Sequence, residues 1–169
     1  KLSTEQGDKR SLAVFQGRIR LCHTFKGDPK QGLWYAEQCF ITAESIKDIN
    51  LAASAAFDLA AGYTIAGDHF KIAELAPKAL ALLESGGSDI GTGARVNVNV
   101  CSSISAFYGY SMANLGHFEE GKALCEKGLR YALEIDNFYS IGLAEIMYGS
   151  LFVVKGDGKN AINHLQIAI

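Results

Sequence analysis

The chain has 169 residues, 49% of them hydrophobic, so it is long and apolar enough to bury a continuous core. Its 16 basic and 18 acidic residues nearly balance and form no long run of one sign, which argues against direct nucleic-acid or membrane partners. The apolar stretches are interrupted by polar residues and no leader-like segment stands out, so a cytoplasmic protein is expected.

Eight helices in four pairs are predicted, and no strand. In chain order the ranges are 8–26 and 29–46, 48–66 and 69–85, 95–115 and 118–135, and 138–155 and 158–169. A glycine stands in the turn within each pair, and these glycines lie 40, 49 and 40 residues apart at Gly27, Gly67, Gly116 and Gly156. The longest connector is predicted over residues 85–94, and Pro77 predicts a kink in the fourth helix.

Further positions recur at fixed distances from the turn glycine. Residues nine, twelve and thirteen after it are small or apolar and share one helix face. Seven residues before it stand Ala60, Gly109 and Gly149, each followed three residues later by a large side chain. Such a pair allows two helices to cross closely. The first unit departs, because Arg20 occupies the small position, which indicates a terminal or degenerate copy.

This pattern resembles the tetratricopeptide repeat over nearly the whole chain, most closely from Ser105 to Leu129 and from Glu145 to Ile169. The resemblance implies an all-α, right-handed α-α superhelix of about eight helices. The longer period is similar to the helical repeats of the maltose transcriptional activator and of the carboxyl-terminal regions of some bacterial adenylate-cyclase and signalling-ATPase proteins. Residues 1–169 are expected to form one repeat domain of a longer multidomain protein.

Repeats of this kind stack their first helices along a concave groove, so the expected function is a non-catalytic scaffold that binds a peptide or protein segment. The alternative, which the resemblance implies, is a sugar- or metabolite-sensing domain of a transcriptional regulator or cyclase. Groove-facing side chains are the candidate binding residues: Arg18, Phe57, Asp58, Phe107, Tyr110, Asn114, Met147 and Ser150. The two phenylalanines and the methionine could equally fill the space between units.

No catalytic residue, metal ligand or cofactor is predicted. The four cysteines are scattered and are expected in the core, and the glycines of residues 86–93 lack the lysine of a phosphate loop. Chaperone-binding family members hold a terminal carboxylate with lysines and asparagines, where this chain has Gly17, Leu21 and Ala106, so that use is not expected. The apolar face of the last helix predicts self-association, through Ile162, Leu165, Ile167 and Ile169.

Overall fold

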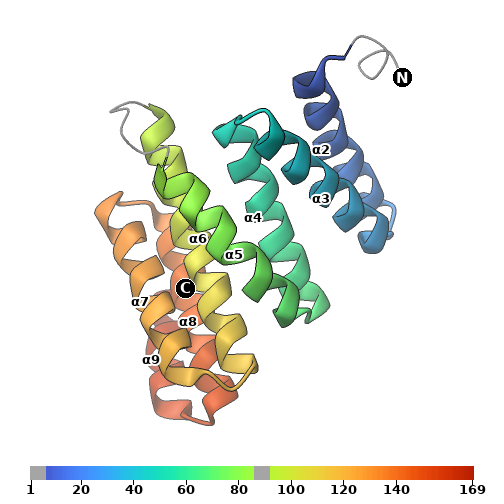
Figure 1. Cartoon of the computed structure of the whole chain (residues 1–169). Coiled ribbons are helices and arrows are strands. Elements are labelled where there is room, and N and C mark those ends of the chain that lie inside the picture. Colours follow the sequence, from blue (N-terminus) through green and yellow to red (C-terminus); the bar gives the residue numbers. More distant parts are fainter. Residues whose placement is uncertain (1–6, 86–91) are drawn as a thin grey trace.

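The computed structural model describes residues 7–85 and 92–169, which form eight α-helices and contain no strand within those ranges (Figure 1). The helices are, in chain order, α2 (Lys9–Phe25), α3 (Pro29–Ser45), α4 (Ile49–Ala66), α5 (His69–Ser85), α6 (Thr92–Asn114), α7 (Phe118–Glu134), α8 (Phe138–Lys155) and α9 (Gly158–Ile167). The predicted ranges are confirmed to within a few residues.

The largest difference from the predicted ranges concerns the start of α6. This helix begins at Thr92 rather than at residue 95, so the last residues of the predicted connector are helical. The rest of that connector, 86–91, lies outside the described residues. Helix α5 runs as one element from His69 to Ser85 with Pro77 inside it.

The predicted glycine turns are confirmed, and all four have the same geometry. Gly27, Gly67, Gly116 and Gly156 have φ values of 79°, 71°, 91° and 79°, a region that glycine adopts without steric cost. In each turn the glycine N–H donates to the carbonyl three residues earlier, and the next N–H donates to the carbonyl five residues earlier. These bonds satisfy carbonyls that the end of a helix leaves without partners.

A second repeated turn, which precedes the first helix of a pair, was not recognised in the sequence. Gly7, Lys47 and Asp136 have positive φ, and the residue after each of them caps the following helix. These caps accept a hydrogen bond from the backbone N–H three residues on, at Asp8, Asp48 and Asn137. The sequence signal was an Asp or Asn directly before the first helix of a pair.

Successive helix pairs lie side by side from α2 and α3 at one end to α8 and α9 at the other (Figure 1). Each helix packs against the next one along the chain, and the first helices of neighbouring pairs also touch. These first-helix contacts are extensive between α4 and α6 and between α6 and α8, but sparse between α2 and α4. The N-terminal pair is therefore attached mainly through α3.

The close helix crossings predicted for the third and fourth units are confirmed. A Cβ on Gly109 of α6 would lie 2.5 Å from the carbonyl oxygen of Gly121 and 2.8 Å from the backbone nitrogen of Cys125, both in α7. A Cβ on Gly149 of α8 would lie 2.7 Å from a side-chain carbon of Leu165 in α9. Only a glycine permits backbones to approach this closely.

Two helices, α4 and α8, are long and apolar enough to cross a membrane by length and composition. Both are central helices here, since α4 packs against α3, α5 and α6, and α8 packs against α6, α7 and α9. A core helix in a helical protein has the same composition, so these two helices carry no evidence for a membrane.

Two expectations about side-chain exposure have different outcomes. The apolar face of α9 is uncovered only in part: Ile162 and Ile167 are exposed by 57% and 63%, whereas Leu165 is half-buried against Gly149 of α8. The expectation that all cysteines lie in the core is wrong for Cys22, which is exposed near the end of α2, whereas Cys39, Cys101 and Cys125 are buried. A helix that packs sparsely against its neighbour leaves more of its surface in solvent.

Candidate functional site

An open trench runs between α2 and α4, with α3 behind it. It has two compartments, and both are lined by these three helices. The first lies beside the middle of α2 and α4, and the second lies nearer to the end where Gly27 turns the chain. The trench exists because α2 and α4 touch sparsely, unlike the later first helices.

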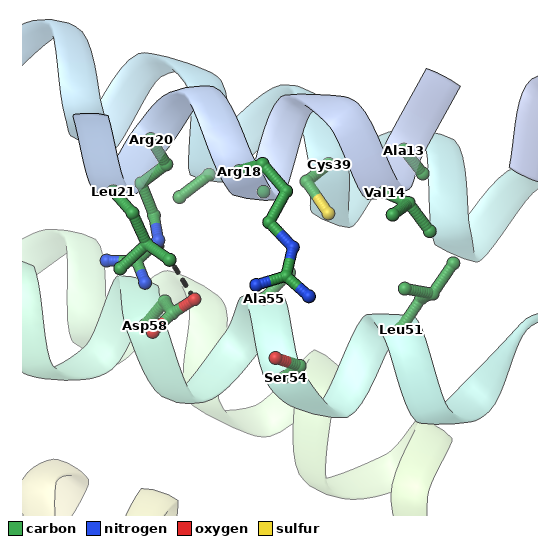
Figure 2. Close-up of a pocket in the computed structure, with 12 residues that line it drawn as sticks. Ala13, Val14, Arg18, Arg20, Leu21, Cys39, Leu51, Ser54, Ala55 and Asp58 are labelled. Atoms are coloured by element: carbon green, nitrogen blue, oxygen red, sulfur yellow. Dashed lines mark ion pairs between the residues drawn. The ribbon is translucent and has the colours of Figure 1, made fainter. Parts of the chain in front are cut away.

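The first compartment, here called the charged compartment, has a volume of about 310 Å³. Apolar residues form most of its walls, among them Val14, Leu51 and Ala55. The Arg18 side chain extends from α2 across the opening toward Ser54 and Ala55 of α4 (Figure 2). Within the described part of the chain, the exposed Arg18 guanidinium makes no hydrogen bond or ion pair. Its charge is available to a ligand.

An ion pair between Arg20 and Asp58 crosses the trench and forms the wall shared by the two compartments (Figure 2). Arg20 Nε lies 3.0 Å from Asp58 Oδ2, and the two side chains are only 17% and 22% exposed. Burial raises the pKa of the Asp58 carboxyl above its usual value, and the charge of Arg20 opposes this effect. The buried Nε is not oriented to donate a hydrogen bond to the carboxylate.

The position of Arg20 in the repeat explains why this ion pair lies there. The equivalent residues of the other units are Ala60, Gly109 and Gly149, which let the two helices of a pair cross closely. The backbone of Arg20 also approaches its partner helix, but less closely. A Cβ on Gly32 would lie 3.3 Å from the Arg20 carbonyl oxygen, against 2.5 Å from a Cβ on Gly121 to the Gly109 carbonyl oxygen. The long side chain therefore leaves the crossing toward α4, where Asp58 pairs with it.

The second compartment, here called the apolar compartment, has a volume of about 420 Å³. Leu33 of α3 and Ala61 and Ile65 of α4 line it, and Ile65 is 88% exposed. Apart from the shared ion pair, the only charged residue that lines it is the exposed Lys30. An apolar side chain would therefore fit here without leaving a buried charge unpaired.

The predicted site residues on α6 and α8 lie away from the trench. The Phe57 and Phe107 rings meet edge to face, with centroids 6.1 Å apart, and Phe107 is only 5% exposed. This aromatic pair joins α4 to α6, so Phe107 fills space between units and offers little surface. Met147 and Ser150 are half-buried on α8.

The Tyr110 and Asn114 side chains interact with their own surroundings in the fold. The Tyr110 ring packs edge to face on His69 of α5, with centroids 5.5 Å apart. Asn114 is exposed and donates a hydrogen bond of 2.9 Å to the Tyr110 carbonyl, one turn earlier in α6. His69 is half-buried, and this burial lowers its pKa.

The structure therefore brings together two of the predicted residues, Arg18 and Asp58, in one compartment. Sequence reasoning missed Arg20, although it noted this arginine at a position that is small in the other units. That substitution was interpreted only as degeneracy of the first copy. Phe57 lies on a separate cavity of about 340 Å³ between α4, α6 and α8, lined also by Asn99, Ser103 and Tyr139.

The trench presents the positive charge of Arg18 above largely apolar walls. Cys39 lies in the wall of the charged compartment, and burial raises the pKa of its thiol, so the nucleophilic thiolate is disfavoured. Across residues 7–85 and 92–169, no three His, Cys, Asp or Glu side chains gather as metal ligands. No protein-family model matches the chain, and a search of curated proteins finds no match either.

Proposed function

We propose that this chain is a non-catalytic binding module with a tetratricopeptide-like, right-handed superhelical architecture. The constant turn geometry at all four glycines and the contacts between successive first helices support this architecture. The module takes a peptide or protein segment along the face formed by α2, α4, α6 and α8, and serves as a regulatory scaffold of a larger cytoplasmic protein.

One observation carries the proposal: Arg18 reaches over an open compartment without a partner of its own. An arginine that only solubilises a surface needs no compartment beneath it. Here the cation lies above apolar walls that a ligand could cover, and this combination is typical of binding sites with a few polar groups on an apolar surface.

Direct binding is the appropriate test of the proposed function. Random peptides displayed on phage are selected on the immobilised protein, and synthetic copies are then titrated by fluorescence anisotropy. We expect Arg18→Ala or Tyr110→Ala to weaken the selected peptides by about 1–2 kcal/mol without a change in helicity. Arg130→Ala provides the control, because Arg130 is an exposed arginine on α7, away from the trench.

A sensor of a small metabolite is the second candidate, favoured by the volumes of the two compartments. About 310 and 420 Å³ fall within the range of small-molecule sites. Thermal shifts with a metabolite collection, together with failure of all peptides to bind, would favour the sensor over the scaffold.

A further inference from the structure

We infer that the trench between α2 and α4 recognises an extended peptide segment in which an acidic side chain and a large apolar side chain lie about three residues apart. The acidic side chain binds Arg18 in the charged compartment, and the apolar side chain enters the apolar compartment. This inference rests on the proposed function and specifies the chemistry of the segment.

The charge balance of the trench favours an acidic ligand. Arg20 and Asp58 neutralise each other across 3.0 Å, so Arg18 leaves the charged compartment with one uncompensated positive charge. A guanidinium binds a carboxylate through two parallel hydrogen bonds, which gives both strength and orientation. The Ser54 hydroxyl lies on the opposite wall, below Arg18, and supplies a further donor (Figure 2).

The walls of the charged compartment suit the stem of an acidic side chain. Val14 and Leu51 lie together on one side of Arg18, and Ala55 lies close to its guanidinium (Figure 2), so these walls would cover the methylene groups of a glutamate. A lysine in the same place would meet the charge of Arg18 in a partly desolvated site. Like charges in such a position oppose binding.

The apolar compartment accounts for the second requirement. Its volume of about 420 Å³ has room for an aromatic or a branched aliphatic side chain. Ile65, exposed by 88%, would lose water contact when such a group enters. Because the Arg20–Asp58 pair separates this compartment from the charged one, the two ligand side chains must enter at separate points.

The spacing of the two side chains follows from helix geometry. Along α2 the lining residues of the two compartments are centred near residues 17 and 22, about 7 Å apart at a rise of about 1.5 Å per residue. Along α4 they are centred near residues 54 and 62, about 12 Å apart by the same rise. Three residues of a polyproline-II chain span about 9 Å, which lies between these values, and they bring the side chain back to the same side because this helix has three residues per turn.

Labelled Gly/Ser-rich peptides with Glu-x-x-Phe, and the same peptides in reversed order, form the first part of the test. Matched peptides replace Glu with Gln or Lys, replace Phe with Ser, or place the two residues side by side. Fluorescence anisotropy at physiological ionic strength measures each dissociation constant. We expect one of the two orders to bind at least about tenfold more tightly than all its matched peptides.

Variants of the protein form the second part. Arg18→Glu should reverse the preference, so that the Lys peptide binds more tightly than the Glu peptide. Ala61→Phe should fill the apolar compartment and remove the advantage of the Phe peptide over the Ser peptide, with circular dichroism as the check on folding. Arg130→Glu makes the same change of charge on the exposed surface of α7 and should alter none of these ratios.

The outcomes separate the inference from the proposed function. If phage-selected peptides bind but Glu-x-x-Phe has no advantage, or Arg18→Glu fails to reverse the preference, the inference is wrong and the scaffold proposal stands. If no peptide binds, both are wrong. If free glutarate or phenylpropionate binds in an Arg18-dependent manner while the peptides do not, the trench is a small-molecule site and the inference is also overturned.

Discussion

Arg20 and Gly109 occupy equivalent positions in the first and third units, seven residues before the turn glycine, yet the surrounding helices pack differently. Around Gly109, α6 packs tightly on α7 and extensively on α8. Around Arg20, α2 keeps its close approach to α3 but makes sparse contact with α4. In the first unit, then, α2 crosses α3 closely although a long, charged side chain occupies the crossing position, while the two neighbouring first helices touch only sparsely.

The junction between α2 and α4, where the first helices touch sparsely, is here called open, and those between α4 and α6 and between α6 and α8 are called closed. The closed junctions have side-chain contacts between their first helices. The Ser140 hydroxyl of α8 donates to Asn99 Oδ1 of α6, and the Phe57 and Phe107 rings join α4 to α6. At the open junction the corresponding connections are ionic: Arg20 with Asp58, and Arg10 with Asp48 at 2.9 Å. Desolvation of the largely buried Arg20–Asp58 pair offsets much of its attraction, and the exposed Arg10 contributes little, so the N-terminal unit has the weaker attachment to its neighbour.

The largest loss of stability is expected from adding one methyl group at Gly109, where α6 crosses α7. Gly109→Ala would place a Cβ 2.5 Å from the Gly121 carbonyl oxygen, and the backbone there has little room to move. We expect the free energy of unfolding to fall by about 2–3 kcal/mol, despite the better helix propensity of alanine. Urea denaturation followed by circular dichroism measures this change.

Gly17→Ala in α2 is the matched control for that substitution. Its Cβ would meet only Cys39 Sγ at 3.8 Å, which is an ordinary contact. Alanine should then be neutral or stabilise the protein by about 0.5–1 kcal/mol, because it lowers the entropy of the unfolded chain. Equal losses at the two positions would contradict the tight crossing of α6 and α7 at Gly109.

A smaller but substantial loss is expected where α9 packs on α8. Glu145 is 5% exposed, and its carboxylate lies 2.6 Å from His164 Nδ1. The His164 ring also stacks on Tyr148, with centroids 4.1 Å apart. His164→Ala leaves a buried carboxylate without its partner, so the free energy of unfolding should fall by about 2 kcal/mol.

His23 provides the comparison in the first unit. It lies 3.7 Å from Asp28 Oδ2, and the Asp28 side chain is 56% exposed. His23→Ala should therefore cost less than about 1 kcal/mol, since water replaces the lost partner. If His23→Ala were as destabilising as His164→Ala in urea denaturation, the C-terminal pair would have no special dependence on its buried contact.

Local sequence patterns were sufficient to predict the helices and the turns within each pair. Glycine at a positive φ and aspartate at a helix start act through the nearest few residues, so their effects can be recognised without the fold. The trench could not be predicted in this way. The wall between its two compartments is an ion pair between Arg20 and Asp58, two residues that are distant in the chain and meet only in the folded protein.

The candidate site was predicted in part for the same reason. The helical period correctly placed Arg18 on the side of α2 that faces α4, but it placed Phe107 in the groove as well. Periodicity identifies a helix face without showing how close the next unit lies. At the closed junction the neighbouring Phe57 covers Phe107, whereas at the open junction nothing among the described residues covers Arg18.

The pH dependence of stability tests whether burial or the charge of Arg20 has the larger effect on the pKa of Asp58. Burial raises the pKa of Asp58 in the folded protein, so the folded state retains its proton more readily than the unfolded state. The contribution of Asp58 to stability should therefore fall as the pH rises from about 3 to 6. Relative to Asp58→Asn, the free energy of unfolding of the unmodified protein should decrease over this range. A rising difference would show that Arg20 dominates over burial.

The smallest effects are expected from two buried serines of α6 that face α7. Both are fully buried, but the Ser102 hydroxyl donates a 2.8 Å hydrogen bond to the Gly128 carbonyl, whereas the Ser105 hydroxyl has no partner. Ser102→Ala removes that hydrogen bond and should cost about 1 kcal/mol, whereas Ser105→Ala removes an unsatisfied group and should be neutral or gain up to about 1 kcal/mol. Thermal melting of the two variants measures the opposite signs. The two substitutions are chemically identical and lie one helical turn apart. Equal losses of stability would therefore mean that the α6–α7 contact responds to side-chain volume alone, and that the Ser102 hydrogen bond contributes nothing to it.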